Sequence, residues 1–363
     1  MNAVFYMADP ADFIRMRTEA LSLMACQDED LQPAYGADRT IGTLRIAGTT
    51  PPTRESRERY IRTEAVMIVH HASEALLRLF YAHVDHVKDC PWLGMSASTD
   101  FAEFKIRLAD AVKTGFNRDE IAMIFLGGTT PADAAIAVPE DDFEDAVDGL
   151  QMLLVDCAKR FIEDSFLYNA VKHGLAAVDT DDDMKMVFTT GDGDQIPLHT
   201  GSMHMFLHRK RHPAAGKAER QWHFTLADVN PQRELSVSAL IGRAIESLWS
   251  VARRRYVGSA GGGVYLISKA SVELAVYGTV REAMNLLRKI TSELIKTDAA
   301  GVNDATHHVP IVYEIPREWE PPSGEHDTDN RYVELPVRQQ DRRIYSTSLT
   351  AYLPITPSGY QRS

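Results

Sequence analysis

The sequence predicts an α+β protein, mostly α, that consists of a helical bundle with a small antiparallel β insertion and a C-terminal helical hairpin. Two long segments, 54–86 and 142–175, repeat apolar residues every three or four positions, which is the period of amphipathic helices. Residues 184–230 instead carry short runs of β-branched and aromatic residues between turns. The 363 residues are 44% hydrophobic and 25% charged, so the chain is long and apolar enough to bury a core without disulfides.

Residues 1–56 are expected to form an N-terminal helix and an arm. The helix is predicted from about residue 12 to 26, and prolines and glycines then mark a loop with one short strand at 43–46. The clearest helix of the sequence, 54–86, should end before Pro91, because the residue preceding a proline disfavours helical backbone angles. Glu74 and Arg78 stand four positions apart on that helix, which favours a surface ion pair.

Residues 57–177 are expected to form one helical bundle. Thr99 and Glu103 favour a second helix that runs to about residue 112, and Asn117 is a typical cap for a short third helix. After a loop, the apolar period predicts one long helix from residue 142 to about 175. Neither long helix can bury its apolar stripe alone, so the two are expected to pack against each other.

The insertion at 178–230 is predicted to be a small antiparallel β segment. Residues 191–194 supply a tight turn between two strands of a hairpin. Further strands are expected at 203–207 and 222–226, where β-favouring residues flank a basic loop.

The C-terminal part of the chain is predicted to begin with a helical hairpin at 231–297. Its two helices are expected at 236–256 and 264–295, where apolar residues again recur at helical spacing. Residues 298–363 are expected to form a proline-rich tail with short strands at 311–315 and 344–352.

Charge and cysteine content restrict the function classes. With 39 basic and 51 acidic residues the net charge is −12, which disfavours nonspecific wrapping of nucleic acid but leaves room for a local basic patch. Most charged runs, such as Arg253, Arg254 and Arg255, are expected to lie on solvated faces. Three widely spaced cysteines without a CxxC pair suggest neither disulfides nor a zinc site.

A cytoplasmic location without a membrane partner is expected. The apolar stretches are interrupted by charged or polar residues well before the roughly 18 residues that a membrane span requires. The N-terminus carries acids and no Lys or Arg before its first apolar residues, unlike a signal peptide.

Two motifs resemble ligand-binding loops only in part. The glycine-rich segment 258–263 lacks the Lys and Ser or Thr of a phosphate loop, so a turn between two helices is favoured. Asp179, Asp181 and Asp183 have the alternate spacing of a calcium loop, but Met184 and Thr190 occupy the positions of its glycine and bidentate glutamate. A solvated acidic turn is therefore favoured.

The histidines of the β segment are the candidate metal ligands. His204 and His208 lie on one side of a predicted strand, and His199, His212 and His223 are close in sequence. No HExxH helix and no partnered cysteines accompany them, so no metal and no cofactor is predicted.

The most suggestive polar segment lies at the end of the predicted helix 142–175. Asn169 and His173 stand one helical turn apart, Lys172 precedes the histidine, and Gly174 favours a helix end. His173 has the pKa range of a general acid or base, and Lys172 is suited to hold a phosphate. The alternative is that Asn169 merely bonds His173 at the helix end.

This segment, Tyr168-Asn169-Ala170-Val171-Lys172-His173-Gly174, resembles the HEPN superfamily of helical domains, and the resemblance covers residues 57–177. It implies a bundle of four or five helices, frequent dimerisation and, in active members, metal-independent RNA cleavage by an Arg and a His four to six residues apart. Here the nearest arginine before His173 is Arg160, thirteen positions away, so the motif's arginine is missing.

Three functions remain open. The resemblance implies an RNA-binding or ribonuclease-type homo-oligomer with Asn169, Lys172 and His173 as catalytic residues. The RNA-binding residues are expected to be Arg209, Lys210, Arg211 and Arg220. The alternative is a noncatalytic dimerising interaction protein of a bacterial or phage conflict system. A small-molecule enzyme that uses the histidines of the β segment is the third possibility.

Overall fold

The computed structural model describes residues 5–85, 90–97, 101–172, 177–211, 220–258, 262–278, 287–297, 303–312 and 330–338. The predicted catalytic residue His173, the capping residue Gly174 and the predicted strand 344–352 lie outside these ranges.

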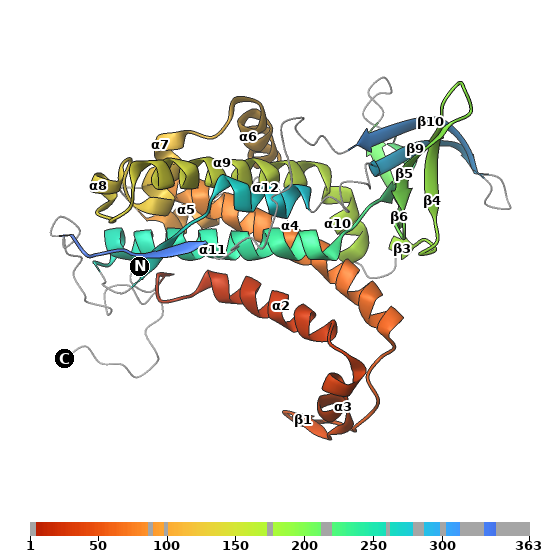
Figure 1. Ribbon diagram of the computed structural model, residues 1–363, viewed down its shortest axis with the longest axis horizontal. Helices are drawn as coiled ribbons and strands as arrows, with labels where there is room; N and C mark the ends of the chain where they lie inside the picture. The colour runs from red at the N-terminus through yellow and green to blue at the C-terminus, as the bar shows by residue number, and fades with distance from the viewer. Residues whose placement is uncertain are drawn as a thin grey trace, which may run out of the picture.

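The predicted α+β class, mostly helical, is confirmed (Figure 1). Three long helices form the body: α4 (Arg54–Asp85), α9 (Glu140–Glu163) and α11 (Pro231–Tyr256). The helix α2 (Pro10–Met24) packs on α4 and α11 from outside. The shorter helical segments are α5 (Pro91–Ala97), α6 (Phe101–Thr114), α7 (Arg118–Ile121), η1 (Ala122–Leu126) and α8 (Pro131–Ala134).

The main core lies where the apolar stripes of the long helices meet. Leu76 and Phe80 of α4, Leu154 of α9, and Ile241 and Leu248 of α11 are all fully buried in one cluster. The expected packing of the two long N-terminal helices is thus present. The core also contains α11, which the sequence pattern had assigned to a separate hairpin.

The predicted helix 142–175 is broken in two at Asp164. The first part is α9, and the second is α10 (Ser165–Lys172), which packs on both α4 and the sheet. Asp164 has φ −95° and ψ 6°, and its carboxylate accepts hydrogen bonds from Arg288 and Lys289 of the sheet. The apolar period does not reveal this break, because the partners of Asp164 lie more than 120 positions away in sequence.

The sheet is larger than the predicted insertion. Its five antiparallel strands have the order β10-β9-β7-β6-β3 and lie at one end of the molecule (Figure 1). Their bounds are β3 (Ala177–Asp179), β6 (His204–Arg211), β7 (Arg220–Ala227), β9 (Leu287–Thr297) and β10 (Asn303–Val312). The predicted hairpin is confirmed as β4 (Lys185–Thr189) and β5 (Gln195–Thr200), which form a separate two-stranded sheet.

The prediction of a second hairpin helix at 264–295 is wrong. Its residues form β8 (Gly263–Leu266), which pairs with β11 (Arg331–Glu334), then α12 (Lys269–Tyr277) and then β9. The apolar residues Leu287, Ile290 and Leu294 fit a helical period, but β9 pairs with β7 on one side and β10 on the other. Cross-strand pairing of this kind overrides a weak local preference.

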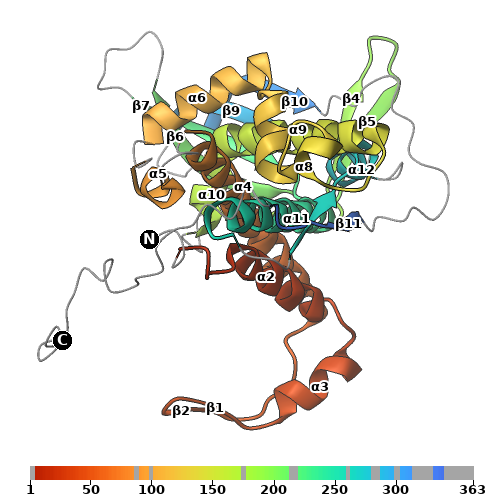
Figure 2. The ribbon, with the colours of Figure 1, turned by 90° about the vertical axis from the view of Figure 1, so that its left-hand side faces the viewer.

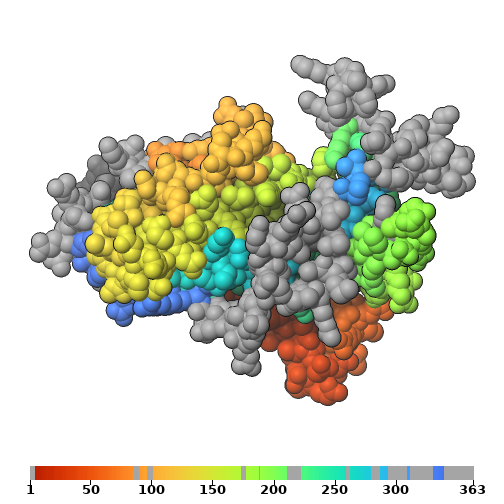
Figure 3. All heavy atoms as spheres, turned by 45° about the horizontal axis from the view of Figure 1, so that its top comes forward, coloured from red at the N-terminus to blue at the C-terminus, as the bar shows by residue number. Residues whose placement is uncertain are grey.

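The arm predicted for the first 56 residues extends away from the body (Figure 2). It contains α3 (Asp28–Gly36) and a short hairpin of β1 (Arg39–Ile41) and β2 (Leu44–Ile46), so the predicted strand 43–46 is present with a partner. In the space-filling view, the helical body forms most of the visible surface, and the β4–β5 hairpin lies at one end of the molecule (Figure 3).

One basic run expected on a solvated face is partly buried. Arg254 is 2% exposed, and its guanidinium donates to the carbonyl oxygens of Gly127 and Ala134. Arg253 donates to the carbonyl oxygens of Tyr6 and Ala8. These arginines therefore tie the end of α11 to the N-terminus and to the loop around α8.

Within the described residues, α11 is long and apolar enough to cross a membrane by length and composition. Core helices pass the same test, and 61% of its most apolar window is buried inside the protein.

Candidate functional site

The predicted catalytic residues that the structure describes lie on α10. Asn169 and Lys172 are both exposed, and the Lys172 ammonium lies 5.0 Å from the centre of the Tyr168 ring. Because His173 is outside the described residues, its predicted pairing with Asn169 stays a prediction.

Tyr168 is the end of a hydrogen-bonded chain that joins three helices. Its hydroxyl lies 2.6 Å from Nε2 of His71 on α4, and Nδ1 of His71 lies 3.1 Å from the Arg17 guanidinium on α2. Arg17 also pairs with Glu64 at 3.3 Å. An arginine can only donate, so Nδ1 accepts and neutral His71 carries its proton on Nε2, where it donates to Tyr168. The Tyr168 proton is therefore directed away from His71.

Burial keeps the neighbouring histidines neutral. It lowers the pKa of His70 to about 4, and His70 stacks on Tyr168 with ring centres 4.1 Å apart. Burial, and then the positive charge of Arg17, lower the pKa of His71. Burial raises the pKa of Tyr168, so its hydroxyl remains a donor at neutral pH. Arg17 was missed by sequence reasoning, because it stands 54 positions from His71 and belongs to no motif.

The predicted basic patch is split between two faces of the sheet. Successive residues of a strand point to opposite faces, so Arg209 and Lys210 leave the sheet on different sides. Lys210 lies on the side of α10, with its ammonium 5.6 Å from the centre of the Phe166 ring. Arg209 lies on the other side, 5.2 Å from the centre of the half-exposed Trp222 ring. The cross-strand pair Arg211 and Arg220 marks the end of these strands.

His204 and His208 of the sheet are buried and are held by other groups. Nδ1 of His204 lies 2.5 Å from Asp179, and Nε2 of His208 lies 2.9 Å from the Thr225 hydroxyl. Burial lowers the pKa of His208 to about 3, and its ring stacks on Phe166. In the part of the chain that the structure describes, no three His, Cys, Asp or Glu side chains are grouped to hold a metal ion.

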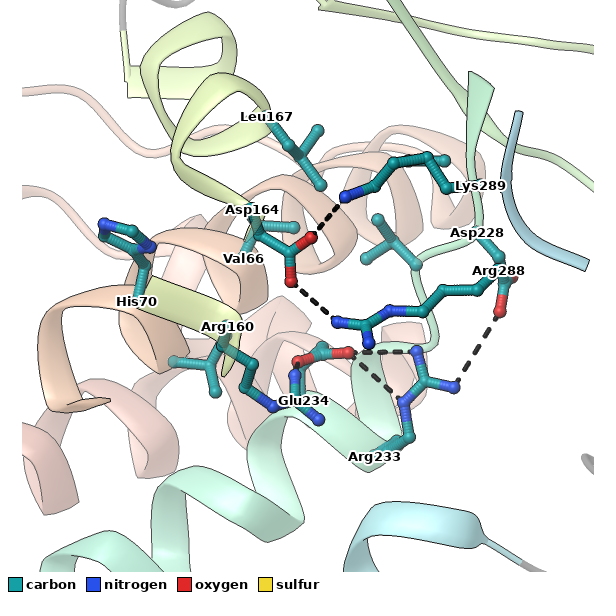
Figure 4. A pocket seen from close by; sticks show the side chains of 13 residues that line it. Val66, His70, Arg160, Asp164, Leu167, Asp228, Arg233, Glu234, Arg288 and Lys289 are labelled. Carbon is teal, nitrogen blue, oxygen red and sulfur yellow. Dashed lines mark hydrogen bonds and ion pairs between the residues drawn. The ribbon is translucent and has the colours of Figure 1, made fainter. Parts of the chain in front are cut away.

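A buried network of charges fixes the sheet on the helical body (Figure 4). Asp164, at the break between α9 and α10, lies 2.8 Å from Arg288 and 2.6 Å from Lys289 of β9. Burial alone would raise the pKa of Asp164, but the positive charges of Arg288 and Lys289 hold it well below its usual value. Arg160 of α9 pairs with Glu234 of α11 in the same network.

The network surrounds a cavity of about 30 Å³, which is large enough for about one water molecule. Glu234 also bonds Arg233, which lies 3.8 Å from Asp228 at the end of β7. These opposite charges are close and buried, so the cluster positions α10 against the sheet.

No family model, no curated protein and no solved structure matches this chain.

Proposed function

We propose that this protein binds single-stranded RNA across α10 and the adjacent end of β6, as the HEPN resemblance of residues 57–177 implies. One observation carries the proposal: Lys172 and Lys210 each lie over an aromatic ring of α10. Asn169 is exposed on the same helix.

This surface combines the two kinds of group that single-stranded nucleic acid requires. Lysine ammonium groups neutralise phosphates, and aromatic rings are platforms on which bases stack. One face of the Tyr168 ring already stacks on His70 and one face of the Phe166 ring on His208, so each ring offers a base at most its remaining face. Both rings are only partly buried. The net charge of −12 opposes RNA binding at long range, so the affinity should be weak and strongly dependent on salt.

Metal-independent cleavage is the catalytic form of the proposal. His71 is not free to act as the base, because its acceptor nitrogen already bonds Arg17. The base is His173, which follows Lys172 in sequence and would deprotonate a ribose 2′-hydroxyl for attack on the adjacent phosphate. The P–O5′ bond then breaks, and the 5′-oxygen leaves with a proton from water. Lys172 and the Tyr168 hydroxyl would stabilise the charge that develops on the phosphate. Arg17 and His71 position Tyr168 for this role.

Binding is tested by fluorescence anisotropy with a labelled single-stranded RNA at salt concentrations from about 50 to 200 mM. Replacing both Lys172 and Lys210 with Gln should weaken binding and reduce the salt slope by about 0.7 for each lost phosphate contact. Arg209→Gln is the matched control, because Arg209 lies on the other face of the sheet. Absence of binding at about 50 mM salt would remove RNA as the ligand.

Cleavage is tested with the same RNA. His173→Ala should reduce the rate by about 10²- to 10⁴-fold, as expected for a general base, while the melting temperature stays nearly unchanged. Activity should persist in EDTA. Loss of activity in EDTA would indicate that cleavage depends on a metal ion. Wild-type protein that binds RNA but does not cut it would leave RNA binding as the function.

A second candidate function, the dimerising interaction protein, is favoured by the outer face of α2. Phe13, Met16 and Leu23 are each 59–66% exposed and follow a spacing of three and seven residues, which places them along one stripe of the helix. Such a stripe is typical of helix pairing. Met16→Glu should turn a dimer into a monomer in light scattering, and a wild-type monomer at high concentration would contradict this candidate.

A further inference from the structure

The arm that extends away from the body is fixed at its base (Figure 2). Arg57 of α4 is 4% exposed, and its guanidinium donates to the carbonyl oxygens of Met24, Cys26 and Pro52. The first two carbonyls lie where the chain enters the arm, and the third lies where it leaves. One buried arginine thus joins both ends of the arm, so the arm is preorganised to project from the body.

The tip of the arm carries an exposed apolar face. Residues paired directly across a hairpin point to the same side, so Ile41 and Leu44 share one face with the partly buried Ile46. Ile41 and Leu44 are 68% and 60% exposed. A two-stranded hairpin is at best marginally stable in water unless its apolar face packs on another surface. The β1–β2 hairpin therefore has a face that a partner would stabilise.

The outer stripe of α2 is a second apolar face of the same chain that stays exposed. The inner stripe of this helix is buried where α2 packs on α4 and α11. The outer stripe consists of exposed residues spaced three, four and three positions apart, namely Phe13, Met16, Ala20 and Leu23. This is the spacing of a helix face that packs on a partner. Because both faces stay exposed, the hairpin and the stripe of one chain do not cover each other.

We propose that two copies of this chain exchange their arms, so that the β1–β2 hairpin of each copy covers the outer α2 stripe of the other. A two-fold axis makes such a contact reciprocal, because each copy then gives one hairpin and receives one. The stripe is about 15 Å long at 1.5 Å per residue, and a hairpin of three-residue strands is about 10 Å long. The inference rests on the second candidate function, the dimer, and names what covers the stripe.

Charge favours a second copy as the partner. Arg39 is exposed and lies on the apolar face of the hairpin, because it stands two positions from Ile41 in the same strand. Glu19 is exposed on α2, three positions after Met16 and four before Leu23, so it borders the outer stripe. A hairpin that lies on the stripe therefore brings an arginine of one copy toward a glutamate of the other.

Leu44→Lys and Met16→Glu are the test variants, both in the full-length chain. Both residues are exposed, so the thermal transition should be unchanged. Each variant places a charge in both contacts of the dimer and should weaken association by about 100-fold, as measured by analytical ultracentrifugation. Ile106→Lys is the matched control, because Ile106 is 71% exposed on α6 of the body. This control should associate like the wild type.

A mixture of the two variants separates arm exchange from pairing of two α2 helices. A mixed dimer has one unchanged contact, and in its other contact the introduced lysine faces the introduced glutamate. The mixture should therefore associate, although neither variant does so alone at the same concentration. If two α2 helices paired with each other instead, Leu44→Lys would leave the dimer intact.

Dimeric wild type and Ile106→Lys, two monomeric variants and a dimer in their mixture would support the inference. A dimeric Leu44→Lys would overturn it, and the second candidate function would then stand if Met16→Glu is a monomer. A mixture that stays monomeric would also overturn it, because positions 16 and 44 then do not meet. A wild-type monomer at high concentration would overturn both the inference and the second candidate function.

Discussion

Two glycines inside helices differ in the space that is available for an added Cβ atom. A Cβ at Gly149 of α9 would stand 2.1 Å from the carbonyl oxygen of Ile267, where the chain leaves β8. A Cβ at Gly242 of α11 would lie 3.9 Å from Ile14 Cγ2, which is an ordinary van der Waals distance. Only the first glycine is required by a close approach of two backbones.

Gly149→Ala and Gly242→Ala should therefore have opposite effects on the free energy of unfolding. The first should destabilise by about 1–3 kcal/mol, because backbone must move to admit the methyl group. The second should stabilise by up to about 1 kcal/mol, the difference in helix propensity between Ala and Gly. Urea denaturation of the two variants measures both. Equal effects would show that the contact at Gly149 is not tight.

Leu76 tests the position of the core stripe. It is fully buried between α4 and the other long helices, so Leu76→Asp would place a carboxylate without a partner in the core. The cooperative thermal transition should be lost. Ile106→Asp is the control, because Ile106 is 71% exposed on α6 and should leave the melting temperature unchanged. A full transition in Leu76→Asp would mean that the stripe is wrongly placed.

At the scale of elements, the junction of α9, α10 and β9 depends on Asp164. Its side chain is 17% exposed and pairs closely with Arg288 and Lys289, whereas the preceding residue, Glu163, is 44% exposed and lies farther from Arg288, at 4.0 Å. Breaking a buried ion pair costs about 3–5 kcal/mol, and a surface pair contributes at most about 1 kcal/mol. Two adjacent carboxylates thus differ in their effect on stability.

Asp164→Ala should lower the free energy of unfolding by about 3–5 kcal/mol, and Glu163→Ala by less than about 1 kcal/mol. Denaturant titration measures both values. Since the sheet attaches to the body at this junction, hydrogen exchange in β7 and β9 should also accelerate in Asp164→Ala. Similar losses in the two variants would contradict the buried role of Asp164.

At the scale of the whole molecule, three neutral histidines make folding sensitive to acid. His70 and His83 have a pKa lowered to about 4, and His208 to about 3, in each case chiefly by burial. They lie in different parts of the protein, since His83 bonds Tyr6 at the N-terminus and His208 lies in the sheet. The unfolded chain binds protons at these positions near pH 6.5, but the folded chain does not.

Their contribution to stability is therefore complete above about pH 6.5 and is lost as the pH falls toward 4. In this window each histidine should lower the free energy of unfolding by at most about 1.4 kcal/mol for each pH unit. Urea midpoints measured from pH 8 to 4 test the prediction, and the midpoint should be flat above pH 7. A midpoint unchanged between about pH 7 and 4.5 would show that these rings are protonated in the folded state.

The sequence by itself determined the fold class, the long helices α4 and α11, the β4–β5 hairpin and the i,i+4 pair of Glu74 and Arg78, which is present at 2.8 Å. These features depend on interactions within a few residues. Periodicity and turn chemistry report such interactions directly.

Tertiary structure decided the features whose partners are distant in sequence. The end of α9 depends on Arg288 and Lys289, the strand β9 depends on pairing with β7, and the orientation of Tyr168 depends on Arg17 and His71. The predicted basic run was divided because neighbouring strand residues face opposite sides. Local patterns cannot specify such contacts, because their energy arises only when segments far apart in the chain meet.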